Sequence, residues 1–120
     1  MSDSLEGLRR RLAEFARERD WEQFHSPKNL AMALIAEAAE LVEHFQWLTE
    51  AQSERLPEAK REAVRLEIAD VLIYLVRIAD RLGIDPIAAA RDKIALNERR
   101  YPADRVRGDA RRAAEYEDDA

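Results

Sequence analysis

The chain has 120 residues, no cysteine, and 20 Lys and Arg against 25 Asp and Glu, which gives a net charge of −5. This is the length of one domain, and the lack of cysteine excludes disulfides, thiolate catalysis and thiolate-bound zinc. The acidic balance argues against a protein that binds nucleic acid polymers, because phosphate binding needs a field of Lys and Arg.

The apolar segments of the chain are short. The longest uninterrupted runs, residues 30–36 and 71–76, fall well below the roughly 20 residues that cross a bilayer. The first six residues lack the basic segment and the apolar stretch of a secretory signal. We therefore expect no membrane contact and a cytoplasmic location.

The low content of Gly and Pro, three and four residues, is typical of a mostly helical protein. A first helix is predicted over residues 4–19. Ser26 before Pro27 predicts an N-cap followed by proline at the first helical position. These two residues begin a second helix, which we expect to run to about residue 50.

A third helix is predicted over residues 57–82, with Pro57 in its first turn and Gly83 as its stop signal. Asp85 before Pro86 predicts the start of a fourth helix, which runs to about residue 100. The remainder, 103–120, is polar and predicts a loose tail, so the domain is expected to cover residues 1–102. The fold class is all-α, and so short a helical chain often extends its core by pairing subunits.

Two acidic pairs interrupt the apolar parts of the second and third helices. Residues 30–42 are apolar except for Glu37 and Glu40, and Glu67 lies three residues before Asp70, which is the one charged residue of 68–76. Residues three apart share a helix face, so each pair converges. In an antiparallel hairpin that turns near residue 53 the two pairs lie at the same height. Four carboxylates are therefore predicted to face one another.

Such a cluster needs compensation, because burying like charges together is costly. These apolar segments offer too few Lys and Arg, whereas divalent cations with oxygen ligands would neutralise the acids directly. With two histidines in the chain, the ligands must be mainly carboxylates, which favours Mg²⁺, with Mn²⁺ as the alternative. The pattern predicts a metal site, although acids three apart on an ordinary helix are more often a solvated face. The four expected ligands are Glu37, Glu40, Glu67 and Asp70.

The acidic segments resemble the signature of the MazG-like superfamily of all-α nucleotide pyrophosphohydrolases, Glu-x-x-Glu followed by Glu-x-x-Asp. In this chain they read Glu-Ala-Ala-Glu over 37–40 and Glu-Ile-Ala-Asp over 67–70. Further segments resemble the dCTP pyrophosphatase branch, and the likeness spans residues 5 to 102. These segments are 15–25, 29–30, 45–47, 70–76 and 100–102. The resemblance implies a four-helix MazG-like bundle that assembles as a homodimer or as a dimer of dimers, a homotetramer.

The resemblance also implies an activity. It is the Mg²⁺-dependent hydrolysis of a deoxynucleoside triphosphate, with dCTP preferred, between the α and β phosphates to give the monophosphate and pyrophosphate. The product chemistry suits the removal of unwanted nucleotides from the pool. Which carboxylate accepts the proton of the attacking water stays open. The alternative is a catalytically silent helical module that binds nucleotide or a protein and keeps the acids as a structural metal site.

The same resemblance assigns Trp21, Trp47 and Tyr74 to recognition of the base and sugar. An aromatic face can stack a nucleobase. Tyr74 lies one turn beyond Asp70 on the same helix face, whereas Trp47, two turns beyond Glu40, is expected to reach the site of a neighbouring subunit. Apart from the resemblance, both Trp residues would be core or interface anchors.

Lys93, Asn97 and Arg100 resemble the family's polar residues near the phosphates and sugar. The alternative for these positions is a solvated basic face near a helix C-terminus. His25 has no acidic partner at a fixed spacing, and we expect a structural role for it. Leu12 departs from relatives associated with methylated cytosine nucleotides, which carry His at this position, so discrimination among cytosine bases is open.

Overall fold

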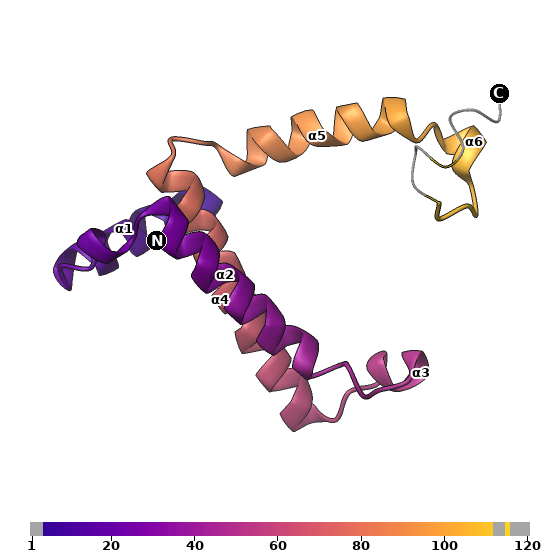
Figure 1. Cartoon of the computed structure of the whole chain (residues 1–120), viewed down its shortest axis with the longest axis horizontal. Coiled ribbons are helices and arrows are strands. Elements are labelled where there is room, and N and C mark those ends of the chain that lie inside the picture. Colours follow the sequence, from indigo (N-terminus) through magenta and orange to yellow (C-terminus); the bar gives the residue numbers. More distant parts are fainter. Residues whose placement is uncertain (1–3, 112–114, 116–120) are drawn as a thin grey trace. The chain divides into compact units, whose positions relative to one another are not determined.

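The computed structural model describes residues 4–111 and residue 115 (Figure 1). The chain forms two compact units, residues 1–84 and 85–120. The first unit contains α1 (Leu5–Glu18), the 3₁₀ turn η1 (Glu22–Phe24), α2 (Pro27–Glu43), α3 (Glu50–Ser53) and α4 (Glu58–Arg81), and the second contains α5 (Pro86–Arg100) and α6 (Ala103–Val106). No strand occurs among the described residues, so the predicted all-α class is confirmed.

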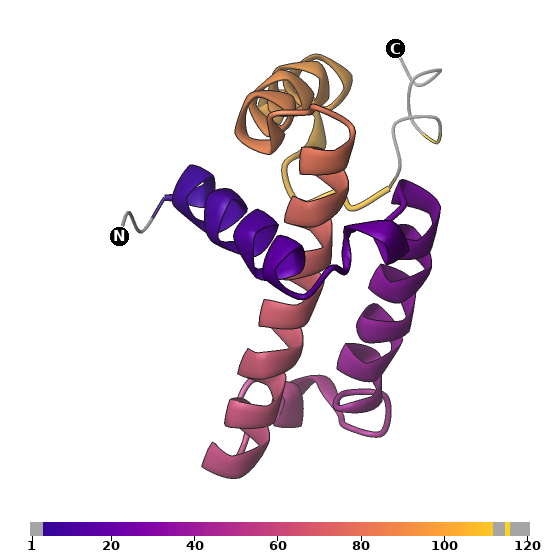
Figure 2. The ribbon, with the colours of Figure 1, turned by 90° about the vertical axis from the view of Figure 1, so that its left-hand side faces the viewer.

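The first unit is built on an antiparallel hairpin of α2 and α4, with α1 packed against α4 (Figure 2). An ion pair between Arg9 of α1 and Asp80 of α4, 3.0 Å long, fixes this second contact near the end of α4. The core is small, and its apolar side chains come from all three helices. The buried apolar residues of the described part are Ala16, Leu30, Val64, Val76 and Ala79.

The helix boundaries that are marked by capping residues, proline or glycine lie where the sequence predicts them. The Ser26 hydroxyl accepts a hydrogen bond from the Asn29 amide, and Pro27 follows as the first residue of α2. The Asp85 carboxylate accepts from two amides in the first turn of α5. Gly83 has a φ of +67°, the left-handed conformation that glycine adopts without strain, just after α4 ends.

The end of the second helix is wrong in the prediction, because α2 stops at Glu43 rather than near residue 50. Turns follow over 44–47, and Thr49 then begins the separate helix α3. The Thr49 hydroxyl accepts from the Gln52 amide, and the Gln52 side chain accepts from the Thr49 amide, at 3.1 and 3.0 Å. This reciprocal capping starts a new helix where the prediction continued the old one. Pro57 is likewise the N-cap of α4 rather than its first helical residue.

Two short elements lie where loops were expected. The turn η1 connects α1 to α2, and α6 occupies residues 103–106 of the predicted loose tail. Residues 112–114 and 116–120 of that tail lie outside the described residues, and the boundary at residue 102 stays a prediction. Within the described residues, none of the helices combines the length and the apolar character that a bilayer crossing requires.

Candidate functional site

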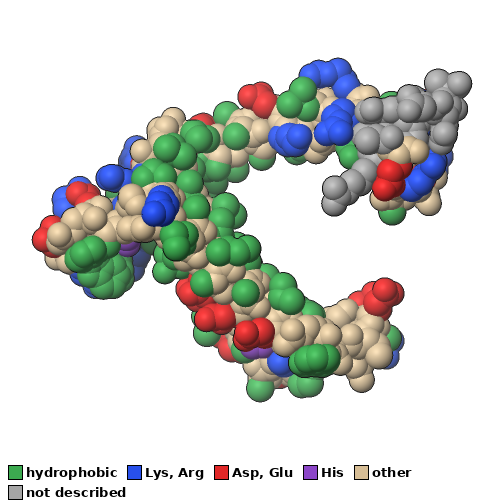
Figure 3. Space-filling view, in the orientation of Figure 1, with side chains coloured by type: hydrophobic (Ala, Val, Ile, Leu, Met, Phe, Trp, Pro, Cys, Tyr) green, Lys and Arg blue, Asp and Glu red, His purple; other side chains and the backbone are tan. Residues whose placement is uncertain are grey.

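The α2–α4 hairpin brings three of the predicted acids together. One carboxylate oxygen from each of Glu37, Glu67 and Asp70 lies within 4.8 Å of the other two. Glu37 comes from α2 and the other two from α4, and all three residues are half-buried. Acidic side chains gather along one stretch of the hairpin, among apolar ones, in Figure 3. The predicted meeting of the two helices at this height is confirmed.

Glu40, the fourth predicted ligand, lies at the edge of this carboxylate cluster of Glu37, Glu67 and Asp70. Its residue is exposed, and none of its oxygens belongs to the close group. Its charge nevertheless acts on Glu37, three residues earlier on α2, where it helps to raise the pKa. The structure therefore gathers three of the four acids within 4.8 Å of one another and leaves the fourth beside Glu37.

The carboxylate cluster carries uncompensated negative charge. Oε2 of Glu37 and Oε2 of Glu67 are buried and accept no hydrogen bond from the described part of the chain. No ion pair among the described residues involves the four acids. Burial raises the pKa of Glu37 from 4.5 to about 7, and so do the hydrogen bonds that protonated Glu37 can share with Glu67 and Glu40 and the charges of Glu40 and Asp70. In the metal-free protein a proton relieves this repulsion near neutral pH.

The same features fit a hard divalent cation. The donors are all carboxylate oxygens, the ligands that Mg²⁺ and Mn²⁺ favour. The two buried oxygens that have no partner among residues 4–111 are positions where a cation would compensate the desolvation of the carboxylates. The residues of the cluster therefore suit the predicted metal, whose identity stays a prediction.

The predicted aromatic residues differ in their surroundings. Tyr74 is half-buried on α4, one turn beyond Asp70. Trp21 precedes η1, is 43% exposed, and meets the rings of Phe15 and His25 edge to face, with centroids 5.8 and 6.2 Å away. Trp47 follows α2 and is 87% exposed. Among the described residues only Trp21 of these three makes a ring contact.

The predicted polar residues Lys93, Asn97 and Arg100 all lie on α5, in the second unit. Lys93 is exposed, and the carbonyl oxygen of Asn97 accepts a hydrogen bond from the Tyr101 amide at 2.7 Å. The Arg100 guanidinium lies 5.7 Å from the centroid of the Tyr101 ring. Their approach to a nucleotide stays a prediction.

One buried charged residue of the first unit was missed by sequence reasoning. Arg77 on α4 is 4% exposed, and its guanidinium reaches both Asp80 on the same helix and His25 before α2. The signal was available, since Arg77 is the one charged residue of the segment 71–79. His25, expected to be structural, has Arg77 as its partner.

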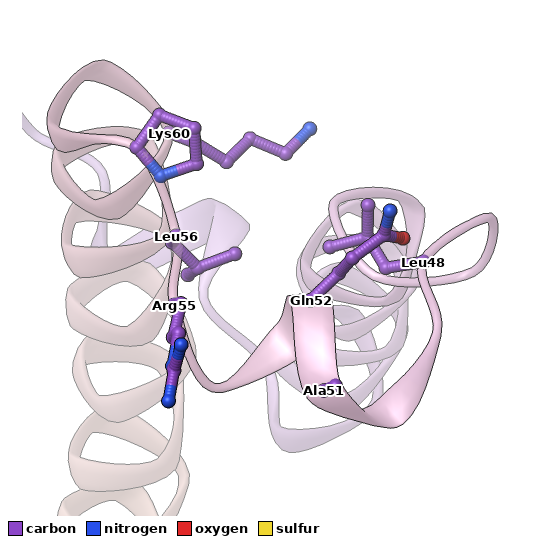
Figure 4. A pocket seen from close by; sticks show the side chains of 7 residues that line it. Leu48, Ala51, Gln52, Arg55, Leu56 and Lys60 are labelled. Carbon is purple, nitrogen blue, oxygen red and sulfur yellow. The ribbon is translucent and has the colours of Figure 1, made fainter.

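A cavity of about 540 Å³ lies away from the acids, where α3 faces the start of α4 (Figure 4). Leu48 and Gln52 line one side, and Leu56 and Lys60 the other. The lining is mostly apolar and contains none of the predicted site residues. It consists of Leu48, Ala51, Gln52, Arg55, Leu56, Pro57 and Lys60.

Comparison with known proteins adds independent findings. The MazG-like family matches residues 33–115. The chain is 46% identical over 114 residues to dCTP pyrophosphatase 1 of Homo sapiens, covering 93% of this chain and 67% of that protein. It is 49% identical over 109 residues to dCTP pyrophosphatase 1 of Mus musculus, covering 89% of this chain and 64% of that protein. The chain thus spans about two thirds of the length of these curated relatives.

The fold has a close counterpart among solved structures. The crystal structure of a pyrophosphatase from Archaeoglobus fulgidus superposes with a TM-score of 0.79 at 42% identity. The match covers 85% of this chain and 95% of that one. Family match, relatives and fold agree with the acidic signature on the facing helices. The chain belongs to the MazG-like family, in the branch of the dCTP pyrophosphatases.

Proposed function

We propose that this protein is a Mg²⁺-dependent nucleoside triphosphate pyrophosphohydrolase that prefers dCTP. It cleaves between the α and β phosphates and releases the nucleoside monophosphate and pyrophosphate. The observation that carries the proposal is the carboxylate cluster on facing helices, in which two buried oxygens lack a partner among the described residues. Identity of 46% and 49% to proteins named dCTP pyrophosphatase 1 supports both the enzyme class and the base preference.

The acids serve this reaction as ligands. Glu37, Glu67 and Asp70 hold the cation, and Glu40 completes the set from the edge of the cluster. When bound, Mg²⁺ or Mn²⁺ offsets the charge of the triphosphate and polarises a phosphoryl oxygen. An acidic protein with a net charge of −5 needs such an intermediary, because its own field repels a polyanion.

The remaining predicted residues bind the nucleotide. Tyr74, one turn from Asp70, and Trp21 offer aromatic surface to the base and sugar. Lys93 and Arg100 of α5 pair with phosphate oxygens, and Asn97 lies near the phosphates and the sugar.

Trp47 indicates that the working site needs a second copy of the chain. Trp47 is 87% exposed on its own subunit, so its ring is available to contact the nucleotide site of a neighbouring subunit. Exposed apolar side chains on α2 and α4, such as Ile35 and Ile68, supply a face for that neighbour. We therefore expect a homodimer or a homotetramer.

The reaction is tested with five substrates. The purified protein is incubated with dCTP, dUTP, dTTP, dATP or dGTP and Mg²⁺, and the products are resolved by ion-exchange chromatography. We expect monophosphate and pyrophosphate, fastest from dCTP, and no turnover in EDTA. Release of diphosphate and orthophosphate would contradict the cleavage position. Five intact triphosphates would direct the assay to modified deoxynucleotides, and if those also stay intact while the melting temperature depends on Mg²⁺, the silent module is favoured instead.

Glu67→Gln tests the role of the cluster within this reaction. It removes a ligand charge and keeps the shape of the side chain, so turnover should fall by about a hundredfold or more while helical circular dichroism is unchanged. Glu62→Gln is the matched control, because Glu62 lies on the same helix and pairs with Arg65 on the exposed face. Equal turnover in the two variants would remove the cluster from the reaction.

A further inference from the structure

Arg77 is a buried cation with unusual partners. It lies on α4 with 4% of its surface exposed, and among the described residues it is the one charged residue that is buried. Nη1 donates to Asp80 Oδ2 at 3.2 Å, Nη2 lies 3.4 Å from His25 Nδ1, and Nε has no partner in the described part. Burial of a charge is costly, so a residue that needed only to pack would be served by an apolar side chain of this size.

The partners of Arg77 connect three elements of the first unit. Asp80 also accepts a hydrogen bond from Arg9 of α1 at 3.0 Å, and Arg9 is in turn paired with Glu6. His25 belongs to the segment between η1 and α2. Arg77 therefore joins the end of α4 to α1 through Asp80, and to the η1 segment directly.

The contact with His25 fixes the state of the imidazole. A guanidinium only donates hydrogen bonds, so Nδ1 of His25 must accept and the proton of the neutral ring sits on Nε2. Burial and the positive charges of Arg77 and Arg81 lower the pKa of His25, which keeps the ring neutral. With one ring nitrogen held from α4, the plane of the imidazole is set.

The imidazole in turn borders Trp21. The two rings meet edge to face, 6.2 Å apart and at an angle of 61°, and Phe15 of α1 contacts Trp21 in the same manner. The backbone of Trp21 is tied to the end of α1, where its amide donates to the Ala16 carbonyl at 2.9 Å. The orientation of the indole thus depends on two rings, of which His25 is the one held by a charge on α4.

We propose that Arg77 is a positioning residue that, through His25, holds the Trp21 indole in the orientation that receives the nucleobase. This inference rests on the proposed function for its ligand, and on the contacts of Arg77 with His25 and of His25 with Trp21 for its geometry. Arg77 lies on the same helix as Asp70 and Tyr74, two turns beyond Asp70. One rigid helix therefore carries part of the carboxylate cluster and also sets the ring expected to hold the base.

The first test needs no nucleotide. In a Trp47→Phe background Trp21 is the sole tryptophan, so its fluorescence anisotropy and acrylamide quenching report on this ring alone. Arg77→Met should lower the anisotropy and raise the quenching constant about twofold, since the imidazole loses its anchor. Arg65→Met is the matched control, because Arg65 also pairs three residues away on α4 but on an exposed face. Unchanged Trp21 fluorescence in folded Arg77→Met would overturn the proposal.

The second test uses kinetics with Trp47 intact. Arg77→Met and His25→Ala should each raise KM for dCTP about tenfold, because a misplaced indole loses part of its stacking on the base. The kcat should stay within about twofold of the parent value. The double variant should match His25→Ala alone, because Arg77 acts through His25. Additive effects, or a fall in kcat at unchanged KM, would contradict the proposal.

One further variant, Arg77→Lys, separates the possible failures. Should Arg77→Met not fold, Arg77→Lys carries the same fluorescence test, since it keeps the buried charge. Lysine keeps the charge but has a single ammonium group in place of the planar guanidinium, which serves Asp80 and His25 at once. Arg77→Lys should therefore be more stable than Arg77→Met and still show the lowered Trp21 anisotropy. If Trp21 loosens as expected but dCTP is not a substrate, the proposed function fails and the positioning link stands.

Discussion

Glu37 is the residue of the carboxylate cluster whose pKa is raised, and the pH dependence of stability can measure this shift. Its pKa is about 7 in the folded, metal-free protein against 4.5 when unfolded. The folded state therefore binds more protons than the unfolded state between these values, and this group's contribution to the free energy of unfolding is full below pH 4.5 and lost as pH rises through 7. Urea unfolding in EDTA from pH 5 to 8 should show this decline.

Substitution isolates the group responsible. Glu37→Gln removes the titrating carboxyl, so its free energy of unfolding should change less with pH than that of the parent and should exceed it above pH 7. Glu43→Gln, an exposed position on the same helix, should keep the parent's slope. If the free energy of unfolding changed with pH equally in all three proteins, a group other than Glu37 would bind the proton.

The sequence predicts the carboxylate cluster because charged residues are conspicuous among apolar neighbours. Glu37, Glu67 and Asp70 meet as expected from helix periodicity and an antiparallel hairpin. The position of Glu40 at the edge could not be predicted, because residues three apart are offset by about 60° around the helix, and the packing of α2 against α4 decides which member of the pair faces the partner helix. The contact between Arg77 and His25 depends on how the segment before α2 folds back on α4, which no local pattern encodes.

At the scale of secondary structure, the N-cap of α2 is a local and measurable contribution. The hydrogen bond from the Asn29 amide to the Ser26 hydroxyl is 3.1 Å long. Ser26→Ala removes this acceptor and should cost about 1 kcal/mol in the free energy of unfolding, measured by urea denaturation. Ser53→Ala is the control, because its hydroxyl donates to a carbonyl in the short exposed helix α3, and it should cost under about 0.5 kcal/mol. Equal costs would mean that the cap does not hold α2.

Helix starts were more predictable than helix ends. Ser26 with Pro27 and Asp85 with Pro86 carry their own chemistry, so α2 and α5 begin where expected. The end of α2 has no glycine or proline to mark it, and the chain leaves the helix at residue 44 because Thr49 and Gln52 begin α3 instead. Such a competition between two helical segments is decided by side-chain hydrogen bonds that composition and periodicity do not contain.

At the scale of the whole molecule, the hairpin exposes more apolar surface than a small single-chain core explains. Several large apolar side chains on α2 and α4 are between 41% and 69% exposed, and Figure 3 shows apolar surface along this part of the chain. Surfaces of this kind mark interfaces. They include Met32, Ile35, Val42, Ile68, Leu72 and Leu75.

The expected homodimer or homotetramer can be tested by introducing a charged residue into the exposed apolar face. Leu72→Arg places a cation in this apolar face and should weaken self-association by about a hundredfold or more, as measured by sedimentation equilibrium. Leu82→Arg makes the same change at a similarly exposed position where α4 ends, and it should leave the assembly intact. The melting temperature of the parent should also rise with protein concentration, because a second copy binds only the folded state. A parent chain that sediments as a monomer at all concentrations would contradict this expectation.

The distribution of the clustered carboxylates over two helices also affects how the first unit opens. Glu37 lies on α2 and Glu67 on α4, so a cation bound between them would add a direct link to two helices that already pack against each other. Separation of the two helices then requires release of the ion, and backbone amides in the middle of both helices exchange with solvent deuterium only after that release. With the proposed Mg²⁺ as this cation, amide exchange in the middle of α2 and α4 should therefore slow as the magnesium concentration rises.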